Sequence, residues 1–142
     1  MTKEKKISPE DYSKILKGVN LKSISLQKSK VYYNYEAKNP SSLAIRIEDS
    51  ATYKLRQDDI VDLFQTYKVD ARKPSSKSRY IQVEVTFVVT LESEFEFTPE
   101  FFEIYKEISL HLNTWPYLRE FVNQATVRMN VPPLTLPLYK AK

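Results

Sequence analysis

The clearest pattern in the sequence is an alternation of apolar and polar side chains that begins after Tyr80. Apolar residues occupy the odd positions from Ile81 to Leu91, while the even positions are polar except at Val88. A period of two residues is typical of a β-strand with one buried and one solvated face. The buried face must be covered by another apolar layer, so this strand constrains what the rest of the chain can form.

Three further stretches have strand patterns of lower contrast. Between Leu21 and Glu36 the apolar phase moves from even to odd positions across residues 27–30, which predicts a bulge or bend. Residues 43–47 alternate after a turn at 38–42, and a weaker strand spans residues 60–71. Short links between consecutive strands favour antiparallel pairing, so we predict a four-stranded antiparallel sheet over residues 21–92.

Two regions carry the signals of helix starts. Ser8 followed by Pro9 predicts a short helix over residues 8–18, and Thr98 followed by Pro99 predicts helices over residues 98–130. Pro116 disfavours helical geometry at the residue before it, so we expect a break or kink around residues 113–115. Residues 131–139 contain three prolines and are expected to lie extended. The patterns together predict one α+β domain, residues 1–142, with helices packed on one face of the sheet.

Composition argues against several classes of function. The chain has no cysteine, one histidine (His111) and one glycine (Gly18), so disulfides, clustered metal ligands and glycine-rich phosphate loops are not expected. We therefore predict no catalytic residue, no metal site and no cofactor. A net charge of +4 permits anionic partners without requiring them. The sequence has no recognisable signal peptide and no membrane span of about 18 apolar residues, which favours a cytoplasmic protein.

Two motifs follow these elements in the C-terminal part of the chain. The first is an aromatic-Pro-Tyr-x-Arg-Glu stretch at residues 115–120, and the second is a proline-containing segment with alternating leucines at residues 132–137. With the sheet and helix before them, these motifs resemble the SecB family of protein-export chaperones. The resemblance implies an ATP-independent chaperone of the holdase type, which assembles as a dimer of dimers and binds unfolded polypeptide clients in long apolar grooves. It implies no catalytic residue.

The chain also departs from the pattern of export chaperones. Family members that serve the export motor are strongly acidic and carry a further C-terminal helix and tail, whereas this chain is positive and ends in "LYKAK". A solo SecB-like chaperone fits these departures better. Its partner would be an antitoxin of a toxin–antitoxin pair or a client from a phage or mobile element, and an export motor is the alternative partner.

Two sets of apolar residues are candidates for the surfaces that such a chaperone needs. Phe102 and Ile104 lie off the main helical stripe, which favours exposure, and the tyrosines after residue 31 combine apolar area with a polar tip. The client-binding candidates are Tyr33, Tyr35, Phe95, Phe97, Phe102, Ile104, Trp115, Leu134 and Leu136. The oligomer-interface candidates, which form a stripe at helical spacing, are Phe101, Tyr105, Ile108 and Leu112.

Two other functions compete with the chaperone interpretation. A nucleic-acid-binding module would use a basic, tyrosine-rich sheet face to hold phosphates and stack bases. The glutamates on the solvated side of the best-defined strand, Glu84 and Glu92, argue against it. A structural subunit, such as a phage assembly component, would form oligomers without affinity for unfolded protein. An enzyme has the least support.

Overall fold

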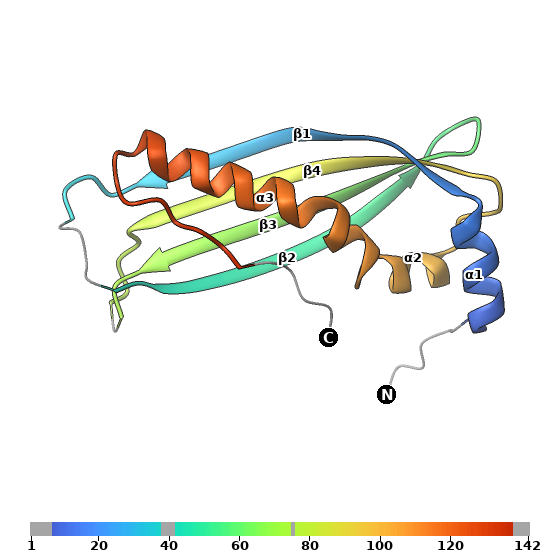
Figure 1. Cartoon of the computed structure of the whole chain (residues 1–142), viewed down its shortest axis with the longest axis horizontal. Helices are drawn as coiled ribbons and strands as arrows, with labels where there is room; N and C mark the ends of the chain where they lie inside the picture. Colours follow the sequence, from blue (N-terminus) through green and yellow to red (C-terminus); the bar gives the residue numbers. More distant parts are fainter. Residues whose placement is uncertain (1–6, 38–41, 75, 138–142) are drawn as a thin grey trace.

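The computed structural model describes residues 7–37, 42–74 and 76–137. Its strands are β1 (Val19–Tyr33), β2 (Ala44–Leu55), β3 (Ile60–Arg72) and β4 (Ile81–Ser93), which pair in the order β1-β4-β3-β2. All three pairings are antiparallel. The helices α1 (Pro9–Lys17), α2 (Pro99–Tyr105) and α3 (Ser109–Arg128) lie on one face, with α1 and α2 at one end of the sheet (Figure 1). The predicted α+β class and sheet architecture are confirmed.

Strand β1 contains the irregularity that its shifting apolar phase predicts. The pairing register with β4 shifts between Leu26 and Lys28, and a second shift lies between Leu21 and Ser23. Each extra residue restores the inward phase of the apolar side chains that follow. The turn predicted at 38–42 falls mostly on residues outside the described ranges. Strand β2 is longer than predicted and continues to Leu55.

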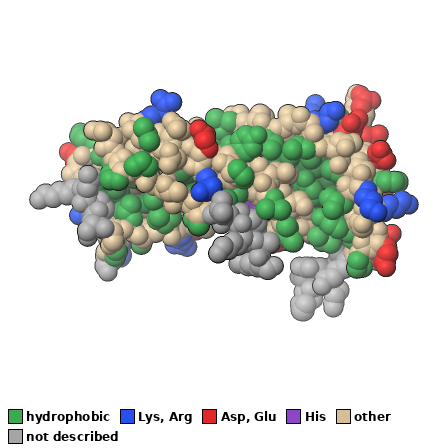
Figure 2. Space-filling model, viewed as in Figure 1, with side chains coloured by type: hydrophobic (Ala, Val, Ile, Leu, Met, Phe, Trp, Pro, Cys, Tyr) green, Lys and Arg blue, Asp and Glu red, His purple; other side chains and the backbone are tan. Residues whose placement is uncertain are grey.

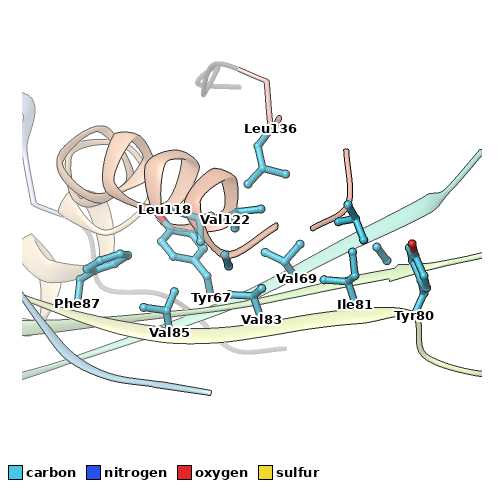
Figure 3. Packing of buried hydrophobic residues seen from close by; sticks show 13 residues of the cluster. Tyr67, Val69, Tyr80, Ile81, Val83, Val85, Phe87, Leu118, Val122 and Leu136 are labelled. Carbon is cyan, nitrogen blue, oxygen red and sulfur yellow. The ribbon is translucent and has the colours of Figure 1, made fainter. Parts of the chain in front are cut away.

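The helix-bearing face of the sheet carries two apolar clusters. Beneath α3, Tyr67, Val83 and Val85 point from the sheet toward Leu118 and Val122 of the helix (Figure 3). Beneath α1 and α2 a second cluster forms. It is built from Val61, Leu63, Val89, Leu91, Phe97, Phe101, Phe102, Tyr105 and Leu110. The odd positions of β4, predicted to form the buried face, are all in these clusters.

The helix starts follow the capping signals in the sequence. Ser8 Oγ accepts a hydrogen bond from the Asp11 amide at 3.0 Å, and Thr98 Oγ1 accepts one from the Phe101 amide at 3.1 Å. Of the break or kink predicted at residues 113–115, the break is wrong, because α3 continues through Pro116. The helical region is interrupted earlier, between Tyr105 and Ser109.

After α3 the chain turns at Asn130 and runs back along the helix as an extended segment, residues 131–137, which we name the C-terminal strap. The Val131 amide of the strap donates to the Thr126 carbonyl at 3.3 Å, and three further hydrogen bonds involve side chains of α3. The amide of Leu134 donates to Thr126 Oγ1 (3.0 Å), Arg119 Nε donates to the Leu136 carbonyl (2.8 Å), and Trp115 Nε1 donates to the Pro137 carbonyl (2.7 Å). The last residues of the predicted segment, 138 and 139, lie outside the described ranges.

Membrane-spanning helices and clustered metal ligands are both absent from the described residues. None of the helices within 7–37, 42–74 and 76–137 has the length and apolarity needed to cross a membrane. In the same ranges, histidine and carboxylate side chains do not gather in threes at metal-binding distance.

Candidate functional site

A groove lies on the helix-bearing face between edge strand β2 and helix α3. Its larger part is a hollow of about 390 Å³. Apolar side chains reach it from three elements: Ile47 from β2, Tyr67 from β3 and Trp115 from α3. The remaining lining residues are Asp49, Glu107, Ile108 and His111. Because β2 pairs with β3 on one side and ends the sheet on the other, this groove opens at a sheet edge.

A smaller hollow of about 230 Å³ continues the groove toward α2. The two hollows share Asp49, Glu107 and His111, so the groove is continuous across them. The other residues that line the smaller hollow are Ser50, Ala51, Gln65 and Lys106. The groove therefore has an apolar end at Trp115 and a polar end at Gln65.

The polar end exists because one core position of the sheet carries a polar side chain and its partner on β2 is small. Gln65 occupies an inward position of β3 between Leu63 of one cluster and Tyr67 of the other. Its register partner on β2 is the small residue Ala51, which leaves space above the sheet. The interruption between α2 and α3 lies over this gap, since Lys106 and Glu107 line the same hollow as Gln65.

A hydrogen-bond network joins the two walls of the groove. His111 Nε2 lies 2.9 Å from Asp49 Oδ2, and His111 Nδ1 lies 2.9 Å from the Tyr67 hydroxyl. The Tyr67 hydroxyl is also 2.8 Å from Thr114 Oγ1. The network connects β2, β3 and α3, so it holds the helix at a fixed distance from the sheet edge.

The C-terminal strap adjoins the apolar end of the groove. Trp115, which lines the groove, also donates the hydrogen bond that holds the Pro137 carbonyl. Leu136 points back toward α3 and the sheet and is 1% exposed (Figure 3). The predicted client-binding role of Leu136 is therefore incompatible with this conformation, whereas Leu134 is half-buried.

Phe97 and Phe102 were predicted to line a surface groove, and the structure contradicts their exposure. Each is 5% exposed and belongs to the core beneath α2. The reason is a partner on β2, because the Tyr53 ring lies 5.2 Å from that of Phe97 and 4.6 Å from that of Phe102. Ile104 is exposed on α2 but does not line the groove.

Three other client-binding candidates lie away from the groove. Phe95 is partly exposed beside α1, with Lys14 Nζ 5.1 Å from its ring centre. Tyr33 is half-buried and makes an edge contact with Tyr80, with ring centres 5.9 Å apart. Tyr35 is 77% exposed in the segment that follows β1, at the end of the sheet away from α1 and α2 (Figure 1). The structure thus brings Trp115, and none of these three, into the groove.

The four oligomer-interface candidates divide into two pairs. Phe101 and Tyr105 are buried within the chain, so the prediction that they form an intermolecular seam is wrong for this conformation. Their rings stack on each other with centres 5.7 Å apart, and Phe101 also stacks on Tyr12 of α1. Ile108 and Leu112 are exposed, and Ile108 lines the groove.

A second apolar surface lies along β1. Register pairing places Leu21, Leu26 and Val31 on the helix-bearing face, opposite the buried Leu91, Phe87 and Val83 of β4. These three β1 residues are each at least 44% exposed. Tyr117 of α3 is also exposed and makes an edge contact with Phe87. Hydrophobic side chains accordingly gather on this face of the molecule (Figure 2).

Sequence reasoning missed most of the groove. Ile47, Asp49, Gln65, Tyr67 and His111 were either assigned to ordinary strand faces or left without a binding role. One signal was available, because Asp49 and Gln65 fall on inward positions of their strands, where an apolar residue is expected.

The fold is that of SecB-like chaperones. The Mycobacterium tuberculosis Rv1957 SecB-like chaperone, solved in complex with a ChAD peptide from the Rv1956 HigA1 antitoxin, superposes with a TM-score of 0.78. The match covers 92% of this chain and 97% of that chain at 17% sequence identity. At this identity the similarity defines the fold, so the resemblance to SecB proteins is confirmed at that level.

A weaker structural match is a protein of unknown function from Streptococcus agalactiae. It has a TM-score of 0.47 and 8% identity over 84% of this chain and 97% of that chain. No protein-family model matches the sequence, and no curated protein matches it either.

Proposed function

We propose that the protein is an ATP-independent chaperone of the holdase type, which binds extended segments of unfolded polypeptides in the groove between β2 and α3. The observation that carries this proposal is the continuous groove at a sheet edge, which is lined by the apolar side chains of Ile47, Ile108 and Trp115. It is supported by the SecB-like fold and by the peptide bound to the mycobacterial neighbour.

The chemistry of the groove suits a client of variable sequence. A client side chain that packs into the apolar end gains about 1.5 to 3 kcal/mol from burial. Association and ordering cost several kcal/mol, so more than one such contact is needed for micromolar binding. The free edge of β2 offers main-chain hydrogen bonds that do not depend on the client's side chains.

We also propose that the chain forms a homo-oligomer, with a dimer of dimers as the expected form. The exposed residues Leu21, Leu26 and Val31 of β1 and Leu112 of α3 support this. Apolar patches of this kind commonly mark interaction surfaces on soluble proteins. An oligomer would also present several grooves to one long client, which increases avidity.

We propose an antitoxin as the natural client. The net charge of +4 and the antitoxin peptide of the mycobacterial neighbour favour a chaperone dedicated to an antitoxin over a general export chaperone. A cytoplasmic location and the absence of enzymatic activity, both expected from the sequence, belong to the same proposal.

Suppression of aggregation tests the proposal. A slowly refolding client is diluted from denaturant with a stoichiometric amount of the protein and no nucleotide, and light scattering is recorded. The protein should lower the scattering, and Ile108→Ser should weaken this effect because it removes an exposed apolar side chain from the groove.

Leu16→Ser is the matched control, since it removes an exposed apolar side chain from α1 without touching the groove. Equal loss of suppression in both variants would show that general surface hydrophobicity, and not the groove, holds the client. No suppression by the wild-type protein would contradict the function itself.

A further inference from the structure

A basic surface lies at the end of the sheet away from α1 and α2 (Figure 1). It is formed by the link between β3 and β4 and by residues 34–37, which follow β1. The two segments are neighbours, because the Asn34 amide donates to the Tyr80 carbonyl at 2.9 Å. We name this surface the basic end. Its exposed cationic side chains are Lys73, Lys77 and Arg79, and it is continued along β1 by Lys28 and Lys30.

The cations of the link between β3 and β4 are available to a partner. Among the residues that the structure describes, Lys73, Lys77 and Arg79 have no carboxylate within ion-pair distance. The neighbouring carboxylate of Asp70 is already taken, because Arg72 Nη2 lies 2.8 Å from its Oδ2. Uncompensated cations that lie close together attract anionic groups.

The glutamates of the outer sheet face, which is the face opposite the helices, do not cancel this charge. Glu84 lies between Lys30 and Lys68 in the register of the sheet, and Glu92 lies near the end that carries α1 and α2. Glu36, exposed after β1, is a single negative charge beside several positive ones. The negative charges that argue against a nucleic-acid surface over the whole sheet are therefore compensated or distant at the basic end.

Acidic side chains gather at the opposite end of the molecule. The turn between β2 and β3 carries Asp58 and Asp59, which share a hollow with Glu96 in the segment before α2. Figure 2 also shows acidic side chains at that end. An anionic polymer is therefore attracted to the basic end and repelled by these carboxylates.

Two exposed tyrosines accompany the cations of the basic end. Tyr35 is 77% exposed, and Tyr32 is 42% exposed. The guanidinium carbon of Arg79 lies 5.1 Å from the centre of the Tyr32 ring, and Arg79 also donates a hydrogen bond to the side chain of Gln82. Aromatic rings and arginine planes are the groups on which unpaired nucleobases stack.

We infer that the basic end binds a single-stranded nucleic acid. Its bases stack on Tyr35 and on the pair of Arg79 and Tyr32, and its phosphates contact the lysines. A duplex fits this surface less well, because its bases are stacked within the double helix and do not reach the tyrosine rings. An acidic polypeptide would pair with the cations and leave the tyrosines unused. The basic end shares no lining residue with the groove, so the inference goes beyond the proposed function and does not rest on it.

Fluorescence anisotropy with labelled probes tests the inference. Single strands of oligo(dT) and oligo(U), each of about 20 nucleotides, and a duplex of the same length are titrated with the full chain. The salt concentration is varied from about 50 to 200 mM, and unlabelled poly-glutamate serves as a polyanion without bases. A single strand should bind about tenfold or more tightly than the duplex, with an affinity that falls as salt increases. Poly-glutamate should compete poorly.

Two variants separate stacking from charge. Tyr35→Ser removes a ring and should weaken binding about fivefold or more at every salt concentration, without changing the salt dependence. Lys77→Gln removes a phosphate contact and should reduce the slope of log affinity against log salt by about 0.7. Both side chains are exposed, so neither variant should lower the melting temperature. A merely structural role would not produce this division between affinity and salt slope.

Tyr117→Ser and Lys17→Gln are the matched controls. They remove an exposed tyrosine from α3 and an exposed lysine from α1, both outside the basic end. Neither should change the affinity for the single strand. Losses equal to those of Tyr35→Ser and Lys77→Gln would overturn the assignment to the basic end, because general surface charge and exposed rings would then explain the binding.

The remaining outcomes also decide the inference. Equal affinity for single strand and duplex would overturn stacking on the tyrosines. Efficient competition by poly-glutamate would overturn the nucleic acid as ligand and assign the basic end to acidic polypeptides. If no probe binds even at the lowest salt concentration, the inference fails, while suppression of client aggregation, and with it the proposed function, is unaffected.

Discussion

At the residue scale, burial of the Tyr105 phenol makes the free energy of unfolding depend on pH in the alkaline range. Its hydroxyl donates to Asn113 Oδ1 at 3.0 Å. Burial raises the pKa of Tyr105 to about 12, and the neighbouring Tyr12 adds to the increase. In the unfolded chain a tyrosine ionises near pH 10. Between about pH 10 and 12 the unfolded chain loses this proton and the folded chain keeps it, so the free energy of unfolding falls as pH rises.

Tyr105→Phe tests this dependence. Denaturant unfolding of the wild-type protein should lose on the order of 2 kcal/mol through this group as pH rises from about 10 to 12. The phenylalanine variant lacks the ionisable group, so its loss over that range should be smaller by this amount. Tyr35→Phe, at an exposed position, should behave like the wild type. If the free energy of unfolding falls equally with pH in all three proteins, Tyr105 is not the source of the dependence.

Individual residues were predictable from the sequence where local chemistry decides their role. The hydroxyls of Ser8 and Thr98 accept amides of the first helical turn, and the proline that follows each of them marks the helix start in the sequence. Phe102 was not predictable, because its partner Tyr53 lies in the half of β2 that the alternation pattern does not reveal. Burial of a side chain on a short helix depends on such distant partners, which local periodicity does not report.

At the element scale, the C-terminal strap depends on side chains of α3 for its position. Thr126→Val keeps the shape of the side chain and removes the acceptor of the Leu134 amide. We expect faster amide hydrogen exchange in residues 131–137 and a loss of about 1 kcal/mol in the free energy of unfolding. The matched control is Thr52→Val on the exposed face of β2. Unchanged exchange in the strap would contradict its dependence on α3.

The strap also contributes to the core through Leu136. Leu136→Ala removes a fully buried side chain from the cluster beneath α3, so we expect a loss of about 2 to 4 kcal/mol in the free energy of unfolding. Leu134→Ala, at a half-buried position in the same strap, should cost less. Equal and small effects in thermal or chemical denaturation would show that the strap is not docked in solution.

The helical elements show where a sequence rule gives way to packing. Pro116 lacks the amide that would bond to the Leu112 carbonyl, and the rule therefore places a break there. Both residues are exposed, so water can satisfy the freed carbonyl, and α3 continues. The actual interruption at residues 106–108 lies over the polar position Gln65, where the sheet offers no apolar surface to a continuous helix. Only the three-dimensional arrangement reveals that coincidence.

At the scale of the whole molecule, the exposed apolar side chains of β1 predict an assembly. We expect sedimentation of the wild-type protein as a species larger than the 16.7 kDa chain, with about 67 kDa for four copies. Leu26→Asp places a charge on the helix-bearing face of β1 and should shift the protein toward the single-chain mass. Lys30→Asp, on the opposite face of the same strand, should not. A wild-type protein that sediments as one chain at high concentration would contradict the assembly.

The overall architecture was largely predictable, because alternation and capping signals define four strands and the helix starts. The groove was not, since it is assembled from β2, β3 and α3, and its polar residues Asp49 and Gln65 look like defects in strand patterns. A polar residue at an inward strand position, where an apolar residue is expected, is therefore a candidate for a functional role.

The most direct test of the groove is site-specific photo-cross-linking to an unfolded client. A photoreactive phenylalanine derivative is placed at Ile47, which lines the groove, or at Glu48, the next residue on the opposite face of the sheet. Both variants are mixed with a client diluted from denaturant, irradiated without nucleotide and analysed by mass. Strong cross-linking from position 47 and little from position 48 is the predicted result. Equal cross-linking from both positions, or none from position 47, would contradict the groove as the site that holds the client.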